Sequence, residues 1–262
     1  MHRRQALPTL AATTMAVTVM ALTATMVQPA PVRAADPASP EGDRIETSQG
    51  ALTVHPLNHA TFVMEWQDMI IHVDPVGGAE RFEQLPPPDL ILITHEHSDH
   101  FDADTLSAVA GDGTEIVTPR SVHDALPAEL AEKATVMANG DTETVSGVAI
   151  EAVPAYNTTE ERLQYHPKGR DNGYVLTLGD RRVYIAGDTE DIPEMRALRD
   201  IDVAFVPMNL PYTMTVEQAA DAVREFAPGI VYPYHSRDSD VDRFAELVGE
   251  DDGIEVRLRD WY

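Results

Sequence analysis

The sequence feature that most constrains the fold is an apolar run that ends in metal-binding side chains. Leu90-Ile-Leu-Ile-Thr94 follows three prolines and is continuously apolar, as a β-strand buried on both faces must be. The next residues, 95–100, supply three imidazoles and the carboxylate of Asp99. Because residues i and i+2 of an extended chain face the same way, His95 and His97 can hold one ion while the end of the run turns toward a second. The pattern predicts a metal site at the end of a buried strand.

Strands are predicted in two groups, because short β-branched or apolar runs alternate with turn residues. The first group comprises Leu52–Val54, Thr61–Met64, Met69–Val73, Leu90–Thr94 and Thr114–Val117. The second comprises Val148–Pro154, Tyr174–Leu178, Val183–Ala186, Asp202–Val206, Ile230–Tyr234 and Ile254–Leu258. Helices are expected from Asp102, from near Pro119, over Thr215–Phe226 with a capping box, and over Asp238–Val248. This order favours two sheets stacked face to face with helices outside.

The amino-acid composition limits the kinds of site and of partner that this chain can have. The 262 residues are 43% hydrophobic, which suits one large α/β domain or two small ones. Cysteine is absent, so disulfides, thiolate metal sites and cysteine nucleophiles are excluded, and any metal must be held by His, Asp or Glu. The formal charge of -25 disfavours nucleic acid and anionic membrane surfaces as partners, because both would be repelled.

The N-terminus has the layout of a secretory signal peptide. The first 34 residues contain no acidic residue, open with Arg3 and Arg4 and continue as an apolar stretch. The paired arginines point to twin-arginine export, and cleavage is expected near Ala34. An uncleaved membrane anchor is the alternative. The expected organisation is a signal peptide over 1–34, a flexible lead-in over 35–50 and one domain over 51–262, in a periplasmic or secreted protein.

The H-x-H-x-D-H run at 95–100 resembles the signature of the metallo-β-lactamase-fold hydrolases. In that family an aspartate also ends an early strand, a later aspartate bridges two metals, and a late histidine completes the site. Asp74, Asp188 and His235 match these positions, and each ends a predicted strand. The resemblance spans residues 54–235. It implies an α/β fold, a four-layer αββα sandwich of two stacked mixed β-sheets with outer helices.

The resemblance also implies two divalent ions, most simply Zn²⁺ with Mn²⁺ as the alternative. The implied metal ligands are His95 and His97 for the first ion, Asp99, His100 and His235 for the second, and Asp188 as the bridge. Asp74 is then expected behind the ligands, where it would orient one of them.

One position departs from the family pattern. Asn157 stands where a histidine is usual, which leaves the first ion with only two obvious protein ligands. Its carbonyl oxygen is an acceptable ligand for a harder ion such as Mn²⁺, and the nearest histidine, His166, is the other candidate. A surface histidine without a role is also compatible with the sequence. Both residues are therefore candidate contacts of the metal or the substrate.

A second sequence segment narrows the resemblance to one branch of the family. Leu57-Asn58-His59-Ala60-Thr61, with Pro-Ala-Tyr-Asn and His-Pro-Lys-Gly downstream, resembles the branch containing L-ascorbate-6-phosphate lactonase-like proteins and N-acylphosphatidylethanolamine phospholipase D. In that branch this histidine lies close to the metals, so His59 either positions substrate or is hydrogen-bonded beneath the site. Tyr212, between a strand and a capped helix, is a candidate for the rim of the site.

The function implied by the resemblance is hydrolysis. Two close divalent ions lower the pKa of a shared water and polarise a substrate oxygen, so a metal-bound hydroxide would cleave an ester, lactone or phosphodiester bond of a small molecule. Asp188 and Asp99 are the expected catalytic carboxylates, the latter assisting proton transfer.

Two alternatives stay open: a phospholipase D-like lipid hydrolase, and a metal-binding protein whose incomplete first site does not turn over. Without residues 1–34 the formal charge would be -28, which disfavours a nuclease. No stable membrane association is expected after cleavage, and the sequence leaves the oligomeric state open.

Overall fold

The computed structural model describes residues 42–249 and 253–262. The predicted signal peptide and the first part of the predicted lead-in lie outside the described residues, so export and cleavage stay predictions. Within the described part of the chain, no helix is both long enough and apolar enough to cross a membrane.

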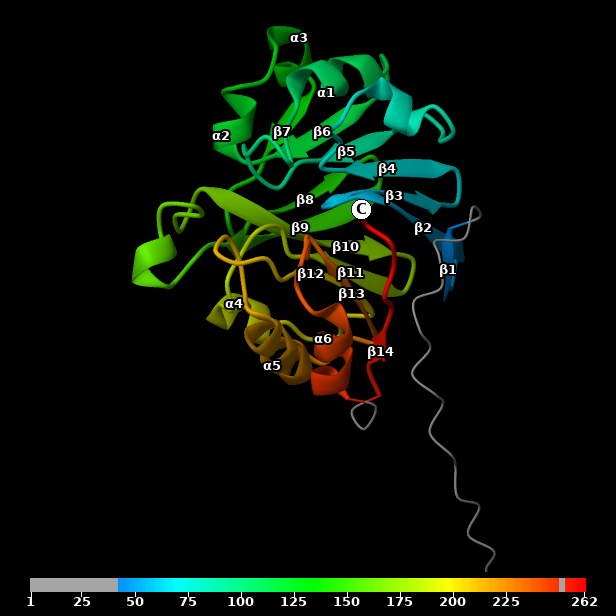
Figure 1. The fold of residues 1–262 in the computed structure, drawn as a ribbon. Helices are drawn as coiled ribbons and strands as arrows, with labels where there is room; N and C mark the ends of the chain where they lie inside the picture. Colours follow the sequence, from blue (N-terminus) through cyan, green and yellow to red (C-terminus); the bar gives the residue numbers. More distant parts are fainter. Residues whose placement is uncertain (1–41, 250–252) are drawn as a thin grey trace, which may run out of the picture. The chain divides into compact units, whose positions relative to one another are not determined.

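The first sheet contains seven strands in chain order from β1 to β7 (Figure 1). They are β1 (Asp43–Thr47), β2 (Gly50–Asn58), β3 (Thr61–Trp66), β4 (Met69–Val73), β5 (Leu90–Leu92), β6 (Glu115–Thr118) and β7 (Ala134–Val136). Neighbours are antiparallel from β1 to β4 and parallel from β4 to β7. The apolar run at 90–94 supplies β5, whose residues are all fully buried because it lies between β4 and β6 and is covered on both faces.

The second sheet repeats this arrangement. Its strands run from β8 at one edge to β14 at the other. They are β8 (Thr142–Val145), β9 (Val148–Ala155), β10 (Asp171–Leu178), β11 (Arg181–Ile185), β12 (Val203–Pro207), β13 (Ile230–Tyr234) and β14 (Glu255–Val256). The strands from β8 to β11 are antiparallel and those from β11 to β14 are parallel. Both sheets are therefore mixed, as predicted.

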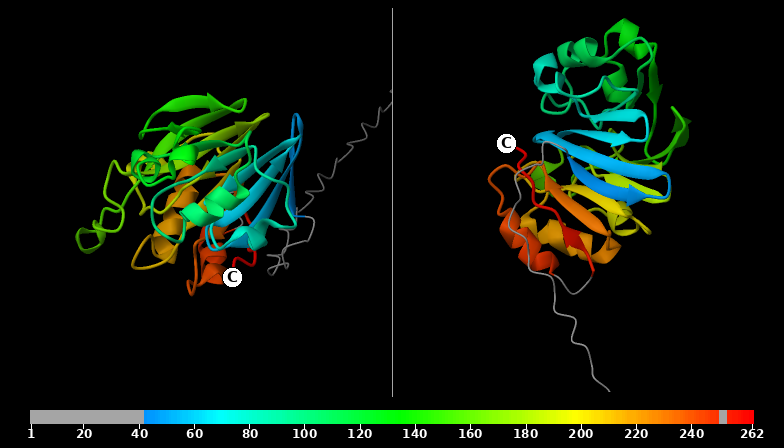
Figure 2. Two further views of the ribbon diagram at one scale, coloured as in Figure 1. Left: turned by 90° about the horizontal axis from the view of Figure 1, so that it is seen from above. Right: turned by 90° about the vertical axis from the view of Figure 1, so that its right-hand side faces the viewer.

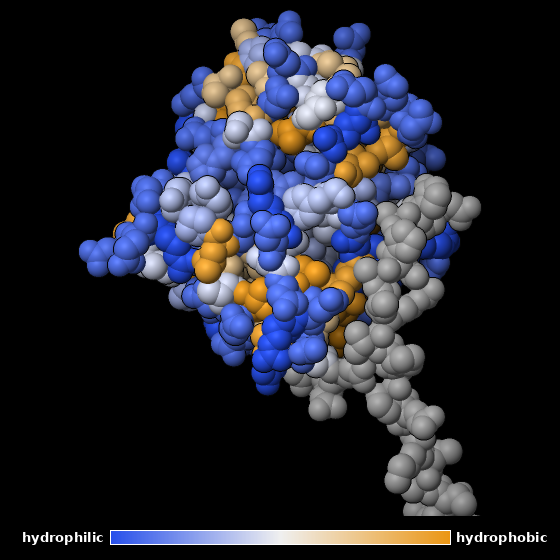
Figure 3. Space-filling view, viewed as in Figure 1, coloured by the Kyte–Doolittle hydropathy of each residue, from blue (hydrophilic) through white to orange (hydrophobic). Residues whose placement is uncertain are grey.

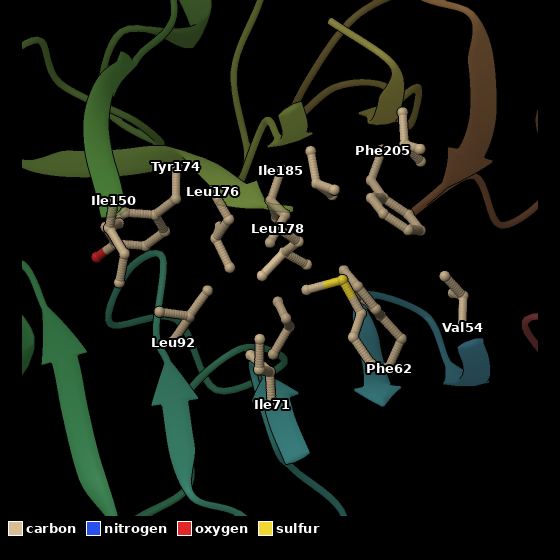
Figure 4. Packing of buried hydrophobic residues seen from close by; sticks show 14 of the residues in the cluster. Val54, Phe62, Ile71, Leu92, Ile150, Tyr174, Leu176, Leu178, Ile185 and Phe205 are labelled. Atoms are coloured by element: carbon tan, nitrogen blue, oxygen red, sulfur yellow. The ribbon is translucent and has the colours of Figure 1, made fainter. Parts of the chain in front are cut away.

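The main core lies between the two sheets (Figure 4). The rings of Phe62 on β3 and Phe205 on β12 stack with centroids 4.2 Å apart, so the two sheets are in direct contact. Burial of these apolar faces is the dominant favourable contribution to a fold of this type. The labelled side chains in Figure 4 are Val54, Phe62, Ile71 and Leu92 from the first sheet, and Ile150, Tyr174, Leu176, Leu178, Ile185 and Phe205 from the second.

Helices cover the outer face of each sheet, which gives the four layers (Figures 1 and 2). The first sheet is covered by η1 (Ala79–Phe82), α1 (Ala103–Val109), α2 (Arg120–His123) and α3 (Ala128–Ala131). The second is covered by α4 (Pro193–Arg196), α5 (Val216–Phe226) and α6 (Val241–Val248), and η2 (Glu160–Arg162) lies in the loop after β9. The capping box predicted for α5 is present, since Thr215 and Gln218 exchange side-chain to backbone hydrogen bonds. The αββα sandwich is confirmed.

The structure corrects two predicted boundaries. Asp43–Thr47 is a strand paired with β2, so residues 43–50 belong to the fold and not to a flexible lead-in. Ile45 is the only buried residue of this edge strand, and so the sequence carries no apolar pattern there. The closing strand is shorter than the predicted Ile254–Leu258, because only Glu255 and Val256 are strand residues. The short strands β7 and β8 were missed for the same reason as β1: they contain few fully buried side chains.

Candidate metal centre

The predicted site residues come from loops that follow strands of both sheets. His59 follows β2 and Asp74 follows β4, while the 95–100 loop comes shortly after β5. From the second sheet, Asp188 follows β11 and His235 follows β13. Functional loops commonly gather at the carboxyl ends of parallel strands. Here they bring side chains more than a hundred residues apart in the sequence to one place.

Three histidines form the first cluster. Nε2 of His95 lies 3.1 Å from Nδ1 of His97. His166 completes the group, and one ring nitrogen from each of the three lies within 4.8 Å of the others. Nε2 of His166 also lies 3.4 Å from Oδ2 of Asp188.

A second cluster lies on the other side of the same carboxylate. Oδ1 of Asp188 is 3.4 Å from Nε2 of His100, and Oδ2 of Asp188 is 3.2 Å from Nε2 of His235. The same nitrogen of His235 lies 3.6 Å from Oδ2 of Asp99. Asp188 therefore stands between the two clusters, where a bridging ligand belongs.

The residues fit divalent cations. Nε2 of His100, His166 and His235 and Oδ1 of Asp188 are all buried without a hydrogen-bond partner, and such buried polar atoms are costly unless something binds them. Two atoms that each lie about 2.1 Å from a tetrahedral ion are about 3.4 Å apart. The separations of 3.1, 3.4, 3.4 and 3.2 Å given above agree with that geometry.

Two buried carboxylates orient the histidines from behind. Asp74 accepts from Nδ1 of His100 at 2.7 Å and from the backbone N–H and hydroxyl of Thr94 at 2.8 and 2.7 Å. Asp171 accepts from Nδ1 of His166 at 3.1 Å. Each contact commits Nδ1 as the donor and leaves Nε2 free as a ligand, which is the usual outer-shell arrangement of metal-binding histidines. Asp74 is located where the sequence analysis expected it.

The tautomer of His59 follows from its partners. The hydroxyl of Tyr262 accepts the backbone N–H of Arg237 at 2.6 Å and lies 2.8 Å from Nδ1 of His59. The ionised carboxylate of Asp99 can only accept, so the ring proton of His59 is on Nε2 and is donated to Oδ2 of Asp99 at 3.2 Å, and the phenol donates to Nδ1. Burial lowers the pKa of His59, which agrees with a neutral ring. His59 thus acts on Asp99 as a hydrogen-bond donor, with its ring stacked against His235 at 3.7 Å.

Four of the eight non-glycine residues with positive φ in the described part of the chain lie at the site. His59, Asp74, His235 and Arg237 are non-glycine residues with positive φ, of 55, 44, 45 and 41°. Such conformations cost free energy and persist where the surrounding structure fixes them, which is common at functional sites. Gly187, just before the bridging carboxylate, also has a positive φ, and a Cβ there would lie 2.8 Å from the carbonyl oxygen of Asn172.

Burial and charge set the protonation of the cluster. Burial holds the pKa of His95 well below its usual value, so this ring is neutral and ready to bind a cation. Burial also acts to lower the pKa of His100, but the carboxylates of Asp188 and Asp74 outweigh it and raise that pKa to about 9. Burial acts to raise the pKa of Asp188, and the surrounding histidines His235 and His100 hold it well below its usual value. A cation would displace the proton of His100, so binding should release protons.

The sequence left the third ligand of the first cluster open between Asn157 and His166, and the structure brings His166 into the cluster. The side-chain amide of Asn157 donates to the carbonyls of Arg162 and Tyr212 at 3.1 and 2.8 Å. Its backbone N–H donates to the carbonyl of His166 at 2.8 Å. Asn157 thus closes the loop that carries the histidine.

A cleft of about 680 Å³ opens onto the clusters. Asp99 and Asp188 reach it from the metal side, and Tyr212 contributes to its rim with 43% of its surface exposed. Sequence reasoning missed Asp171 and Tyr262. Asp171 opens a strand five residues after a histidine, which is a weak signal, and Tyr262 carries no local signal at all.

Comparison with known proteins agrees with this geometry. Residues 53–235 match the family model of the β-lactamase superfamily domain. The chain belongs to this superfamily. A UPF0173 metal-dependent hydrolase of Pyrococcus horikoshii is 31% identical over 209 residues, covering 74% of this chain and 91% of the relative. A second, from Thermococcus kodakarensis, is 30% identical over 207 residues with the same coverage of both chains.

Comparison with solved structures shows proteins of similar fold. The crystal structure of a protein from Parabacteroides distasonis, named as a metal-dependent hydrolase, is similar with a TM-score of 0.77 and 46% identity, covering 83% of this chain and 97% of that chain. A metallo hydrolase of Ignicoccus hospitalis shares the fold at 22% identity, with a TM-score of 0.66 and coverage of 79% and 94%. The metallo-β-lactamase fold is confirmed, and the chain belongs to a family of metal-dependent hydrolases. The lactonase-like and phospholipase D-like branch stays a prediction.

Proposed function

We propose that the protein hydrolyses an ester, lactone or phosphodiester bond of a small molecule at a two-metal centre. The observation that carries this proposal is the position of Asp188. Its Oδ2 lies 3.4 Å from Nε2 of His166 in the first cluster and 3.2 Å from Nε2 of His235 in the second, and its Oδ1 lies 3.4 Å from Nε2 of His100. A carboxylate so placed can bridge two ions. Two bridged ions, when bound, would supply an activated water and polarise the substrate.

The ligand roles follow from the two clusters. In this proposal His95, His97 and His166 would hold the first ion, Asp99, His100 and His235 would hold the second, and Asp188 would contribute to both. A donor set rich in neutral imidazole nitrogen favours Zn²⁺ over Mn²⁺. Because His166 supplies a third nitrogen, the alternative of an incomplete and inactive first site loses its main support.

Asp99 is the proposed proton carrier. Its side chain is 42% exposed and lines the cleft, whereas the side chain of Asp188 is buried at 3% exposure. Oδ2 of Asp99 accepts from His59, which orients the carboxylate toward the cleft. A carboxylate in this position can pass a proton to the leaving group while the closed side of the cluster excludes water.

The cleft supports a small polar substrate over a phospholipid. Its lining includes His97, Ser98, Asp99, Asn209 and Asp238. The face shown in Figure 3 is mainly hydrophilic, with its hydrophobic residues in separate groups. A lipid-directed enzyme would need a continuous apolar surface for docking.

A substrate panel tests the proposed function. Zinc-loaded protein is incubated with lactones, aryl esters, phosphodiesters and phospholipids, and bound metal is measured by elemental analysis. We expect two metal ions per chain and turnover of at least one small substrate. Asp188→Ala should lose metal from both clusters. Full metal content without turnover of any compound would overturn the hydrolase proposal, and turnover of phospholipids alone would overturn the choice of substrate class.

Export is a separate proposal. It is supported by the acid-free N-terminus with Arg3 and Arg4 and by the small residue at Ala34. Mass spectrometry of protein from the producing cells and their medium should find a new N-terminus close to Ala35. An intact Met1 in the mature material would show that the signal is not cleaved.

A further inference from the structure

One basic side chain at the cleft has no use in the proposed mechanism. Arg237 lines the cleft two residues after His235 and shares it with Asp99 and Asp188. Arg237 is exposed, and its backbone is fixed in two ways: it has a φ of 41°, and its N–H donates to the hydroxyl of Tyr262 at 2.6 Å. The base of this side chain is therefore held in place while its guanidinium remains exposed to the solvent.

Among the described residues, the guanidinium of Arg237 makes no hydrogen bond and no ion pair. Within residues 42–249 and 253–262 its electrostatic neighbour is the phenol of Tyr262, which carries no charge to neutralise it. The chain contains 44 acidic and only 19 basic residues, so carboxylate partners are plentiful. Even Asp238, the next residue, makes no ion pair with it in the described structure. A cation without a carboxylate partner among the described residues thus lies in the cleft.

We propose that Arg237 binds an anionic oxygen group of the substrate, a carboxylate or a phosphate that is distinct from the bond being cleaved. This inference rests on the proposed function and names its substrate class. A guanidinium presents a planar fork of donors that matches such groups in a bidentate way. The overall charge of -25 repels anions at long range, so an anionic substrate needs a local cation to be retained.

The residues at the rim of the cleft indicate the polarity of the rest of the substrate. Leu210 and Tyr212 line the same cleft and are 50% and 43% exposed. The ring of Tyr212 packs edge-on against Tyr165 with centroids 4.9 Å apart, so it is supported in this position. We therefore expect the substrate to carry a short apolar part that packs on this rim, besides the reacting bond and the anionic group.

Matched ligand pairs test this without turnover. Zinc-loaded protein is titrated calorimetrically, at constant ionic strength, with succinate, glutarate, adipate and pimelate and with the monocarboxylates of equal chain length. One carboxylate can reach the metals, and only the dicarboxylates can reach Arg237 as well. We expect at least one dicarboxylate to bind about tenfold more tightly than its monocarboxylate, as one charge-assisted contact predicts. Arg237→Gln should abolish that preference.

Two controls make the result specific. Arg237→Lys keeps the charge but not the fork, and should retain part of the preference. Arg243→Gln removes an exposed arginine that pairs with Glu246 on α6 and does not line the cleft, and should retain all of it. Equal binding of both ligand classes by the wild type, or a preference that survives Arg237→Gln, would overturn the inference. Because the readout is binding, a failure to hydrolyse any compound would count against the proposed function alone.

Discussion

At the scale of single residues, the centre is organised by what each histidine does with its second ring nitrogen. His100 and His166 give Nδ1–H to Asp74 and Asp171, and both present an unpartnered Nε2 to the Asp188 carboxylate. His59 is reversed, because its Nδ1 receives a proton from outside and its Nε2 becomes a donor. The same residue type thus serves as a ligand or as a support, depending on one hydrogen bond.

The first prediction concerns the third ligand of the first cluster. His166→Ala should lower metal affinity there by more than about 100-fold, since the loss of a direct ligand exceeds the 10–100-fold effect of an outer-shell change. Asn157→Ala should keep the metal content at two ions per chain, because its amide supports the loop. Titration of Zn²⁺ into metal-free protein checks this. Unchanged binding by His166→Ala would show that the first ion is held by other groups.

The second prediction concerns Tyr262. Tyr262→Phe removes the proton donor to His59 but keeps the ring, so we expect about a tenfold loss of metal affinity or kcat through misorientation of Asp99. His59→Ala should cause a similar loss. The double variant should be no worse than either single variant, because both act through one chain of hydrogen bonds. Additive losses in this cycle would show that the two residues act separately.

At the scale of elements, the loop from Asn157 to His166 is fixed by one buried carboxylate. Glu190 is fully buried and accepts from the backbone and hydroxyl groups of Thr158 and Thr159 at 2.7–3.0 Å. It also pairs with Arg162 at 2.8 Å. Glu190 thus connects the loop that carries His166 to the segment that follows Asp188.

The third prediction tests these contacts of Glu190. Glu190→Gln keeps the shape but removes the charge, so it should lower the free energy of unfolding by roughly 2–4 kcal/mol. It should also make the loop susceptible to proteolysis and weaken the first metal site. Glu161→Gln is the matched control, since Glu161 is exposed in the same loop. Equal effects of the two variants in urea unfolding would contradict the assignment.

At the scale of the whole molecule, stability depends on a buried neutral histidine far from the cleft. His72 on β4 is 1% exposed, stacks on Phe82 at 5.0 Å and lies 3.3 Å from the carbonyl oxygen of Pro86. Burial lowers the pKa of His72 to about 4. The unfolded chain, with a pKa near 6.5, binds more protons between these values, so stability is complete above pH 6.5 and falls as the pH drops toward 4.

The fourth prediction follows from the direction of this pH dependence of stability. Between pH 7 and pH 5 the contribution of His72 should fall by about 2 kcal/mol. His72→Gln should lack this component, so the difference between wild type and variant isolates it from the histidines of the metal centre. Urea unfolding of both proteins at the two pH values is the measurement. Parallel losses in the two proteins would mean that His72 does not titrate as proposed.

Much of the architecture and of the centre could be predicted from the sequence. A strand buried on both faces requires a continuous apolar run, so β5 could be predicted from the sequence. The histidines that follow it indicated a metal site. Asp74, Asp188 and His235 could be placed because each ends a predicted strand, and strand ends of stacked sheets meet at one edge. Composition excluded thiolate ligands outright.

Only the tertiary structure decided the contacts between distant segments. Sequence spacing could not choose between Asn157 and His166, because the choice depends on how one loop closes against Glu190 and Tyr212. Nor could it connect Tyr262 to His59 across 203 positions. Local patterns fix what a short segment prefers, since its apolar period and turns act within a few residues. Hydrogen bonds between segments depend on the packing of the whole chain, and these select the ligand and its tautomer.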